Sequence, residues 1–439
     1  MITARSKEEI LSASRVEEVI GEYVNLKKRG TNYIGLCPFH TEKTPSFNVS
    51  PTKGIFKCFG CGKAGDVITF LIEHEKFTYP EALRWLAQKY HITIEETGDT
   101  AKDQDDKMLM ESLYIINQFA QEYFHSNLYK TEEGETIGLA YFKERGLTEE
   151  MIQKFKLGYA LQQENAFTIT ATKSGYQLEL LKKAGLVVNR GYSDVDFFHQ
   201  RVIFPLLNLS GKVVAFAGRI MVKDERSPKY INSPETEIYQ KSKLVYGIHQ
   251  ARTSIRQHDE CFLTEGYTDV ISMHQAGIEN VVASSGTSLT DDQIKLIKRF
   301  TDNITILYDG DEAGIKAALR GLEMMASQDV NIRVVLLPDG DDPDSFLHKK
   351  GSAALREFIR DNKKHFLQFK TEVLMKDAGT DPLKRADVIK EVVGTLALVP
   401  DVVRRSILLK EVSRMLDVRE QVLITEVNKQ RRAKFNKET

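Results

Sequence analysis

The 439-residue sequence has few cysteines, no long apolar segment and almost no net charge. No apolar run reaches the roughly 18 residues that a membrane-spanning helix needs, and the N-terminus lacks the features of a signal peptide. Three of the four cysteines lie between positions 37 and 61, which argues against a disulfide framework and favours metal ligation in a reducing compartment. We therefore expect a cytoplasmic protein with no membrane partner.

The net charge of -1 conceals a separation of charge along the chain. Residues 27–63 hold seven Lys and Arg against one acid, and residues 199–256 hold ten against four. Residues 257–350 reverse the balance, with eight basic residues against seventeen acidic ones. Basic segments suit a nucleic-acid backbone, and bound cations can offset an acidic excess. Dispersal of these charges over solvated faces is the alternative interpretation.

Two acidic clusters follow short apolar runs at equivalent points of an alternating strand and helix pattern. Glu265 and Asp269 follow one run, and Asp309 and Asp311 follow another. Open α/β sheets hold their ligands at the carboxyl ends of strands, which is where these side chains are expected. Carboxylates without His or Cys suit a hard cation such as Mg²⁺, which usually brings substrate phosphates with it. The pattern predicts metal-assisted phosphoryl chemistry.

Four potential zinc ligands occur as two short-spaced pairs, Cys37 with His40 and Cys58 with Cys61. Such pairs on the turns of a small sheet can form the closed tetrahedron of a structural Zn²⁺ site. A redox pair at positions 58 and 61 is the alternative. Four protein ligands leave no open coordination position, so we expect this zinc to hold the fold rather than take part in chemistry.

Aromatic and basic residues alternate through the same region. Bases could stack on the rings while phosphates meet the ammonium groups, so single-stranded nucleic acid is the expected partner. The alternative is that two or three of these rings form the core of the small domain. The residues are Tyr33, Phe39, Phe47, Phe56 and Phe59 among Lys43, Lys53, Lys57 and Lys63.

Periodicity predicts a multi-domain α+β protein that includes an α/β parallel sheet. Ser14 and Glu17 have the spacing of a capping box, so a helix is expected to begin there. The polar stretch 96–107 is the best linker. We predict five segments: a zinc-binding domain at 1–95, a linker at 96–107, a mixed subdomain with a basic groove at 108–256, a parallel α/β subdomain at 257–345 and a helical subdomain at 346–439.

The strand and helix assignments of the parallel subdomain are specific. Its predicted strands are 261–264, 280–283, 304–308 and 332–337, separated by helices at 267–276, 290–300 and 312–328.

With these motifs, the sequence resembles the bacterial replicative DNA primases from the zinc ribbon through the helical end of their catalytic core. Cys37-Pro-Phe-His40 and Cys58-Phe-Gly-Cys61 are similar to the primase zinc ribbon. Glu265-Gly-Tyr-Thr-Asp269 and Asp309-Gly-Asp311 are similar to the Toprim metal-binding fold of that family. The resemblance implies DNA-directed synthesis of short RNA primers at the replication fork.

The resemblance also implies roles for individual residues. Glu265, Asp309 and Asp311 would be the catalytic acids and would carry the Mg²⁺ ions, with Asp269, Asp342 and Asp344 completing the acidic ring. Template and nucleotide binding would fall to Arg145, Arg201, Arg219, Lys229, Asn232 and Lys241. For Arg201 and Arg219, structural ion pairing is the alternative. For Asp311 and Asp344, the alternative is a helix N-cap or a residue of the first helical turn.

The implied cofactors are one structural Zn²⁺ and two or more catalytic Mg²⁺ or Mn²⁺ ions. The implied partners are a single-stranded DNA template and ribonucleoside triphosphates, and we expect a monomer. The family usually carries a further helical domain that docks on the replicative helicase. We expect that domain to be absent from this chain, which stops at Thr439 soon after the core ends, either because the sequence is truncated or because this version lacks the domain. Helicase binding is therefore expected for the parent protein and is not placed on these residues.

Other functions fit parts of the pattern. A Toprim topoisomerase or nuclease would share the acids, but the zinc ribbon and the basic tract at 199–256 fit it poorly. A zinc-ribbon DNA-binding module with a vestigial acidic core would retain function without Asp309. A phosphatase with Asp309 as nucleophile would leave Glu265 and the ribbon without a role.

Overall fold

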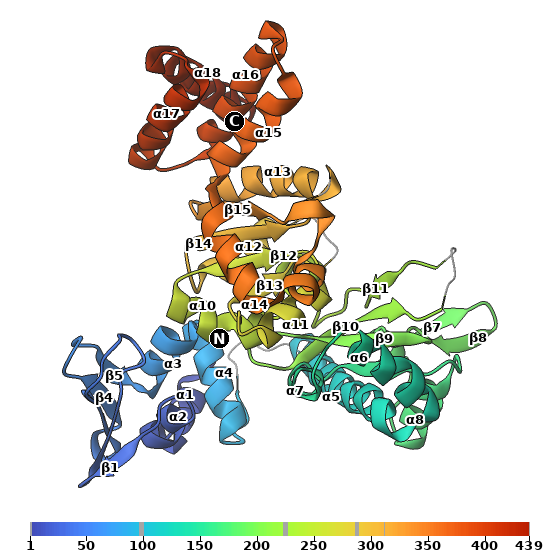
Figure 1. The fold of residues 1–439 in the computed structure, drawn as a ribbon. Helices are drawn as coiled ribbons and strands as arrows, with labels where there is room; N and C mark the ends of the chain where they lie inside the picture. Colours follow the sequence, from blue (N-terminus) through green and yellow to red (C-terminus); the bar gives the residue numbers. More distant parts are fainter. Residues whose placement is uncertain (1, 96–100, 223–226, 286–288, 311, 439) are drawn as a thin grey trace. The chain divides into compact units, whose positions relative to one another are not determined.

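The computed structural model describes residues 2–95, 101–222, 227–285, 289–310 and 312–438. The chain forms two compact units, Met1–Met108 and Leu109–Thr439, and each is described here by itself. Figure 1 shows both units as ribbons.

Unit 1 is built on a five-stranded antiparallel sheet in which each strand pairs with the next along the chain. Phe47, Val49 and Phe56 lie on one face of this sheet and are buried together with Phe70. The small sheet expected around the zinc ligands is therefore confirmed. The strands are β1 (Lys27–Arg29), β2 (Asn32–Gly35), β3 (Phe47–Ser50), β4 (Ile55–Cys58) and β5 (Ala64–Asp66).

Helices complete unit 1: α1 (Ala4–Ala13), α2 (Val16–Gly21), α3 (Val67–Glu75) and α4 (Tyr79–Lys89). The capping box predicted at Ser14 is wrong, because Ser14 instead ends α1 and its hydroxyl donates to the Ile10 carbonyl. A true capping box starts α4, where Thr78 and Glu81 bond reciprocally. Ser and Thr satisfy helix carbonyls as readily as helix N–H groups, so spacing alone did not separate the two ends.

Residues 101–107, which the sequence placed in the linker, are the first two turns of α5 (Ala101–Lys130). Their Lys, Asp and Gln residues are compatible with an exposed helix although they offer nothing to a core. Residues 96–100 of the predicted linker lie outside the described residues.

The first part of unit 2 contains a four-stranded antiparallel sheet in the order β11-β10-β9-β6. The central strands β9 (Arg201–Leu207) and β10 (Val213–Ile220) are buried over most of their length. The edge strands are β6 (Gly158–Ala160) and β11 (Tyr230–Asn232), and a separate hairpin joins β7 (Val187–Arg190) to β8 (Ser193–Asp196). Around them lie α6 (Ala140–Glu144), α7 (Glu149–Lys154), α8 (Ala166–Lys173), α9 (Leu178–Lys183) and α10 (Ile248–His258).

The second part of unit 2 is the predicted parallel sheet, in the order β13-β12-β14-β15-β16. Its four long strands are β12 (Cys261–Thr264), β13 (Val281–Ala283), β14 (Asn303–Tyr308) and β15 (Asn331–Leu336), all parallel. They alternate with α11 (Tyr267–Gln275), α12 (Asp291–Lys298) and α13 (Glu312–Ser327). These bounds confirm the sequence prediction to within a few residues. The antiparallel edge strand β16 (Lys364–His365) was not predicted.

Helices dominate the end of the chain, as expected. They are α14 (Pro343–Asn362), which is interrupted at Gly351, followed by α15 (Phe366–Ala378), α16 (Pro382–Leu398), α17 (Val402–Leu416) and α18 (Glu420–Glu438). Side chains from α15 to α18 share one core with the parallel sheet, so these helices belong to unit 2.

Candidate active site and zinc site

Carboxylates from three successive strand ends meet at one edge of the parallel sheet. Glu265 directly follows β12, Asp309 directly follows β14, and Asp342 lies beyond β15 at the start of α14. Together with Asp269 they line one cavity of about 660 Å³. The parallel arrangement explains the convergence, because carboxyl ends of parallel strands share an edge. Asp311 lies outside the described residues.

Asp269 is the most deeply buried of these acids. It lies in the first turn of α11, where its Oδ2 accepts a hydrogen bond from the Gly266 N–H at 3.0 Å. Burial, followed by the charges of Asp342 and Asp309, raises the pKa of Asp269 well above its ordinary value. A cation among these carboxylates would offset their repulsion, and an all-oxygen donor set fits Mg²⁺ or Mn²⁺.

Asp342 and Asp344 occupy different environments. Asp342 is the N-cap of α14, where its Oδ1 accepts from the Ser345 N–H at 2.6 Å. Asp342 is therefore the N-cap, and Asp344 lies in the first turn of the same helix, which is the second form of the alternative considered for it. Asp344 is 2% exposed, pairs with Arg145 and accepts from the Ser272 hydroxyl at 2.5 Å. It is absent from the lining of the cavity, so its placement is that of an ion-pair partner.

The six predicted template and nucleotide residues divide into two groups. Arg145, Lys229, Asn232 and Lys241 line the acidic cavity. The Asn232 amide is held in place, since its Oδ1 accepts from the Tyr267 hydroxyl at 2.5 Å and its Nδ2 donates to the Ser285 carbonyl at 3.3 Å.

The other two arginines are absent from the lining of the cavity. Arg201 is 6% exposed and donates to the carbonyls of Gly218 and Pro228. Burial lowers its pKa. The half-buried Arg219 guanidinium lies over the Tyr141 ring, 4.6 Å from its centroid. These contacts are structural but are not the ion pairs considered as the alternative, and template or nucleotide binding by either arginine stays a prediction.

The sequence did not single out several residues that line the cavity: Tyr230, Tyr267, Ser284, Ser285, Leu289, Arg320, Gly321 and Met324. Some signal was present for the serines, because they follow β13 at the same sheet edge as the acids. No signal was available for the residues of α13, since only the tertiary structure turns one side of that helix toward the cavity.

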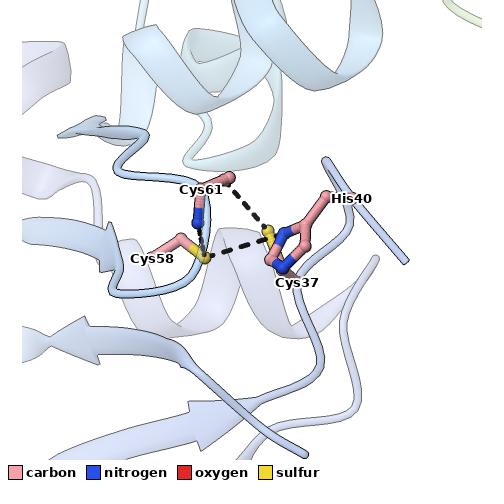
Figure 2. Close-up of side chains that lie close together, drawn as sticks. All are labelled: Cys37, His40, Cys58 and Cys61. Atoms are coloured by element: carbon pink, nitrogen blue, oxygen red, sulfur yellow. Dashed lines mark hydrogen bonds between the residues drawn. The ribbon is translucent and has the colours of Figure 1, made fainter. Parts of the chain in front are cut away.

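The four predicted zinc ligands converge in unit 1, as Figure 2 shows. The Cys37, Cys58 and Cys61 sulfurs and a His40 ring nitrogen all lie within 4.8 Å of one another. The Cys37 and Cys61 sulfurs are 3.8 Å apart. A tetrahedral zinc with Zn–S bonds of about 2.3 Å separates its sulfurs by about 3.8 Å, so the residues fit a structural zinc ion.

Glu42, which the sequence analysis did not consider, organises this site. His40 Nδ1 faces the Cys58 sulfur at 3.8 Å, while its Nε2 lies 3.2 Å from Glu42 Oε2. Glu42 Oε1 accepts from the backbone N–H groups of Cys37, at 2.7 Å, and Ser46, at 3.0 Å. A carboxylate behind a ligating histidine fixes the ring orientation and leaves Nδ1 for the metal.

The cysteine thiols differ in acidity. Burial raises the pKa of Cys37 to about 12. Burial also acts to raise the pKa of Cys58, but hydrogen bonds from Ser46, Cys61 and Gly60 outweigh it and lower the pKa to about 6. Thiolate character at Cys58 favours metal ligation.

The aromatic residues of unit 1 serve mainly as its core. Phe47 and Phe56 are fully buried, and Phe39 and Tyr33 pack against them. Phe59 is the exception, since it is 69% exposed with the Lys57 ammonium 5.3 Å from its ring centroid. Lys57 shares the exposed face of the sheet with Lys27, Ile34 and Asn48, which occupy the same rung. The core alternative is therefore correct for most of the rings.

Across the described parts of the chain, none of the helices combines the length and the apolar character required to cross a bilayer.

Four family models match the chain. They are a CHC2 zinc finger at residues 2–102, the N-terminal domain of the DNA primase catalytic core at 123–252, a Toprim-like domain at 262–347 and the DnaB-helicase binding domain of primase at 367–421. They confirm the predicted combination of a zinc ribbon, a mixed subdomain and a Toprim-type sheet.

Curated relatives and solved structures agree with these matches. The chain is 41% identical to a DNA primase of Halalkalibacterium halodurans over 88% of this chain and 65% of that protein. It is 38% identical to a DNA primase of Listeria monocytogenes over 93% of this chain and 67% of that one. The chain thus spans about two thirds of the length of these relatives.

Among solved structures, the zinc-binding and RNA polymerase domains of the Aquifex aeolicus primase are 33% identical. The match has a TM-score of 0.64 and covers 96% of this chain and 99% of that one.

One expectation is wrong. A helicase-binding domain was expected to be absent, yet residues 367–421 match the model of the DnaB-helicase binding domain of primase. The match covers α15, α16, α17 and the first residues of α18. Helical periodicity reports only which face of a helix is buried, so it could not distinguish a scaffold from a protein-binding domain in this segment.

Proposed function

The chain belongs to the bacterial DNA primases, and on this premise we propose that it synthesises short RNA primers from ribonucleoside triphosphates on a single-stranded DNA template. The observation that carries the proposal is the convergence of acidic and basic side chains on one cavity. Glu265, Asp269, Asp309 and Asp342 line it together with Arg145, Lys229 and Lys241. Carboxylates for metal ions next to cations for phosphates are the parts that phosphoryl transfer requires.

The acidic side chains have a common role in this proposal. Glu265, Asp269, Asp309 and Asp342 would hold the Mg²⁺ or Mn²⁺ ions, with Asp311 and Asp344 as further predicted ligands. Two such ions, when bound, lower the pKa of an attacking 3′-hydroxyl and neutralise the leaving pyrophosphate. The buried position of Asp269 keeps one carboxylate fixed by the Gly266 N–H, so little reorganisation is needed on binding.

The basic and amide side chains would position the nucleotide. Lys229 and Lys241 carry the charges suited to a triphosphate, and Asn232 is oriented by Tyr267 to present its amide. Arg145 also forms an ion pair with Asp344, and this pair holds the guanidinium in place at the cavity. Arg201 and Arg219 would support the groove from within the neighbouring sheet.

The experiment that tests the proposal is primer synthesis by the full chain and by Asp309→Ala. We expect the wild type to make oligoribonucleotides only with template, ribonucleotides and Mg²⁺ or Mn²⁺. The variant should lose synthesis by about 100-fold or more, as expected for a group that acts on developing charge. Its binding of single-stranded DNA should survive.

Other outcomes would identify the competing functions. Cleavage or relaxation of DNA without ribonucleotides, and without any RNA product, would indicate a Toprim topoisomerase or nuclease. Unchanged function of Asp309→Ala would indicate a DNA-binding module with a vestigial core.

The exposed face of the ribbon sheet suits the template. Phe59 offers a ring for stacking, and Lys27 and Lys57 offer charge for the backbone. We expect Phe59→Ala to weaken single-stranded DNA binding by about 1 kcal/mol, the lower end for one stacked base, while zinc content stays constant. Phe56→Ala is not a suitable control because Phe56 belongs to the core. Tyr79→Ala, which removes an exposed ring of unit 1 at the start of α4 and outside the sheet, is the matched control.

The match at residues 367–421 supports a contact between this helical segment and the replicative helicase. Action at the replication fork would place the protein in the cytoplasm. We also propose that the chain is divided into the five segments predicted from the sequence, which end at residues 95, 107, 256, 345 and 439.

A further inference from the structure

One wall of the acidic cavity has no role in the chemistry above. It comes from α13 and from the segment before α12, and it consists of Leu289, Arg320, Gly321 and Met324. We call these four residues the α13 wall. It contains no carboxylate, and three of its four members are uncharged. It therefore offers no ligand for a metal ion, and Arg320 is its single charged group.

The α13 wall adjoins the core into which the helix packs. Ala318, Leu322 and Met325 are fully buried in that core beneath the sheet, Leu289 is buried with them and Met324 packs against them. Met324 lies about one turn from both Arg320 and Gly321, so these three residues lie on the adjacent side of the helix. They line the cavity, and Arg320 is the exposed member of the four.

Gly321 indicates that the cavity side of the helix is kept open. Glycine destabilises a helix interior relative to alanine, so it needs a reason. The backbone supplies none, since Gly321 has ordinary helical geometry. Packing supplies none either, because an added Cβ would lie 3.8 Å from Met325 Cε and 3.9 Å from Leu289 Cδ2, both ordinary contacts. What a larger side chain would change is the space beside Leu289, another residue of the α13 wall.

The chemistry of the wall suits a flat, aromatic group. Gly321 has no side chain and leaves a flat surface. The Met324 thioether and the Leu289 isobutyl group can contact the face of a ring, and the Arg320 guanidinium can stack on that face. The Arg320 guanidinium has no hydrogen-bond or ion-pair partner among the described residues. Contacts of this kind do not read base edges, so they suit an enzyme that accepts four different bases.

We propose that the α13 wall is the nucleobase subsite of this cavity, holding the base of a ribonucleoside triphosphate whose phosphates lie at the acids and lysines. This inference rests on the proposed function. Arg320 and Gly321 are then positioning residues for the nucleotide rather than groups that act on the reacting atoms.

The test compares ATP with inorganic tripolyphosphate, which carries the phosphates without a base. Binding of each to the full chain with Mn²⁺ is measured by calorimetry. We expect Gly321→Leu to weaken ATP binding by about 10-fold or more and Gly321→Ala to weaken it less, in proportion to the space filled. Tripolyphosphate binding should stay within about twofold of wild type, because the side chain does not reach the phosphates.

Arg320 is tested in the same way with a matched control. Arg320→Ala and Arg320→Lys should both weaken ATP binding by about fivefold, because stacking needs the guanidinium plane and not only its charge. Lys295→Ala removes an exposed charge from α12 and should leave both ligands unaffected. CTP, GTP and UTP should show losses like those of ATP.

Several results would overturn the inference. Equal losses for ATP and tripolyphosphate would assign the wall to phosphate binding, rescue by Arg320→Lys would assign Arg320 a purely electrostatic role, and a loss for one base only would indicate base-edge reading. Met324→Ala gives a second measurement if Gly321→Leu does not fold. Wild-type protein that prefers ATP over tripolyphosphate but makes no RNA would contradict the proposed function and leave the base subsite standing.

Discussion

The zinc site of unit 1 and the acidic cavity of unit 2, which we propose to hold Mg²⁺ or Mn²⁺, relate to their folds in opposite ways. The zinc ligands lie between Cys37 and Cys61, on the turns of a sheet whose strands are three or four residues long. The acids lie between Glu265 and Asp342, at the ends of strands with buried residues on both faces. In unit 1, zinc binding is expected to stabilise the fold. In unit 2, the fold brings the carboxylates together before any metal binds.

The two sets of ligand side chains also contribute to the free energy of folding with opposite signs. Zinc binding adds folding free energy to a ribbon too small to bury enough apolar surface by itself. The carboxylates of the cavity repel one another, and this repulsion contributes to the raised pKa of Asp269. Unit 2 tolerates the repulsion because the sheet shares extensive cores with the surrounding helices.

The largest expected effect comes from Cys58→Ser, which removes a buried ligand sulfur. We expect loss of zinc and unfolding of the ribbon sheet, while unit 2 keeps its fold because its cores contain no residue of unit 1. Zinc content and hydrogen exchange measure the two responses. Strong hydrogen-exchange protection of β2 to β4 in the zinc-free variant would contradict the prediction that the ribbon sheet requires zinc to fold.

A smaller effect is expected from Glu42→Gln, which keeps the shape of the side chain but replaces one accepting oxygen with a donor. Both carboxylate oxygens accept hydrogen bonds in the structure, so one of these contacts must be lost. Zinc affinity should fall about 10- to 100-fold without loss of ligands. Lys43→Gln, at the exposed neighbouring position, is the control, and a chelator titration provides the measurement.

The smallest effect, and the one of opposite sign, is expected from Asp269→Asn. The change removes one of the mutually repelling charges and retains an oxygen that can accept from Gly266. Metal-free unit 2 should become more stable, because burial and the charges of Asp342 and Asp309 disfavour the Asp269 carboxylate, although primer synthesis should fall. Thermal unfolding with and without Mg²⁺ tests it. A lower stability in the absence of metal would show that Asp269 supports the fold, and the contrast between the two sites would then fail.

Most of the fold could be predicted from local patterns. The strands of the parallel sheet were found because apolar runs bounded by polar loops are characteristic of strands buried on both faces. Errors occurred where two structures share one local pattern. Ser14 satisfies carbonyls at the end of α1 instead of starting α2, and residues 101–107 are helical because a polar composition suits an exposed helix as well as a linker.

The residues of the candidate sites also differ in how far local sequence patterns could predict them. All four zinc ligands were predicted from spacing, because short turns restrict where the side chains can lie. Glu42 was missed although it lies two residues from His40, since nothing in the spacing shows which way its carboxylate points. Arg201 and Arg219 were predicted for the groove, but their environment depends on how β9 and β10 pack, and the structure buries Arg201 among backbone carbonyls.

The features that depend on nearby residues were therefore determined by the sequence alone. They are the set of zinc ligands, the order of strands and helices, and the acids at strand ends. These features depend on neighbours a few residues apart, whose geometry the backbone restricts. The tertiary structure alone decided which acids share a cavity, that Asp344 pairs with Arg145, and that Arg320 and Gly321 line the same cavity as Glu265. Those arrangements depend on packing between segments far apart in sequence, which no local pattern specifies.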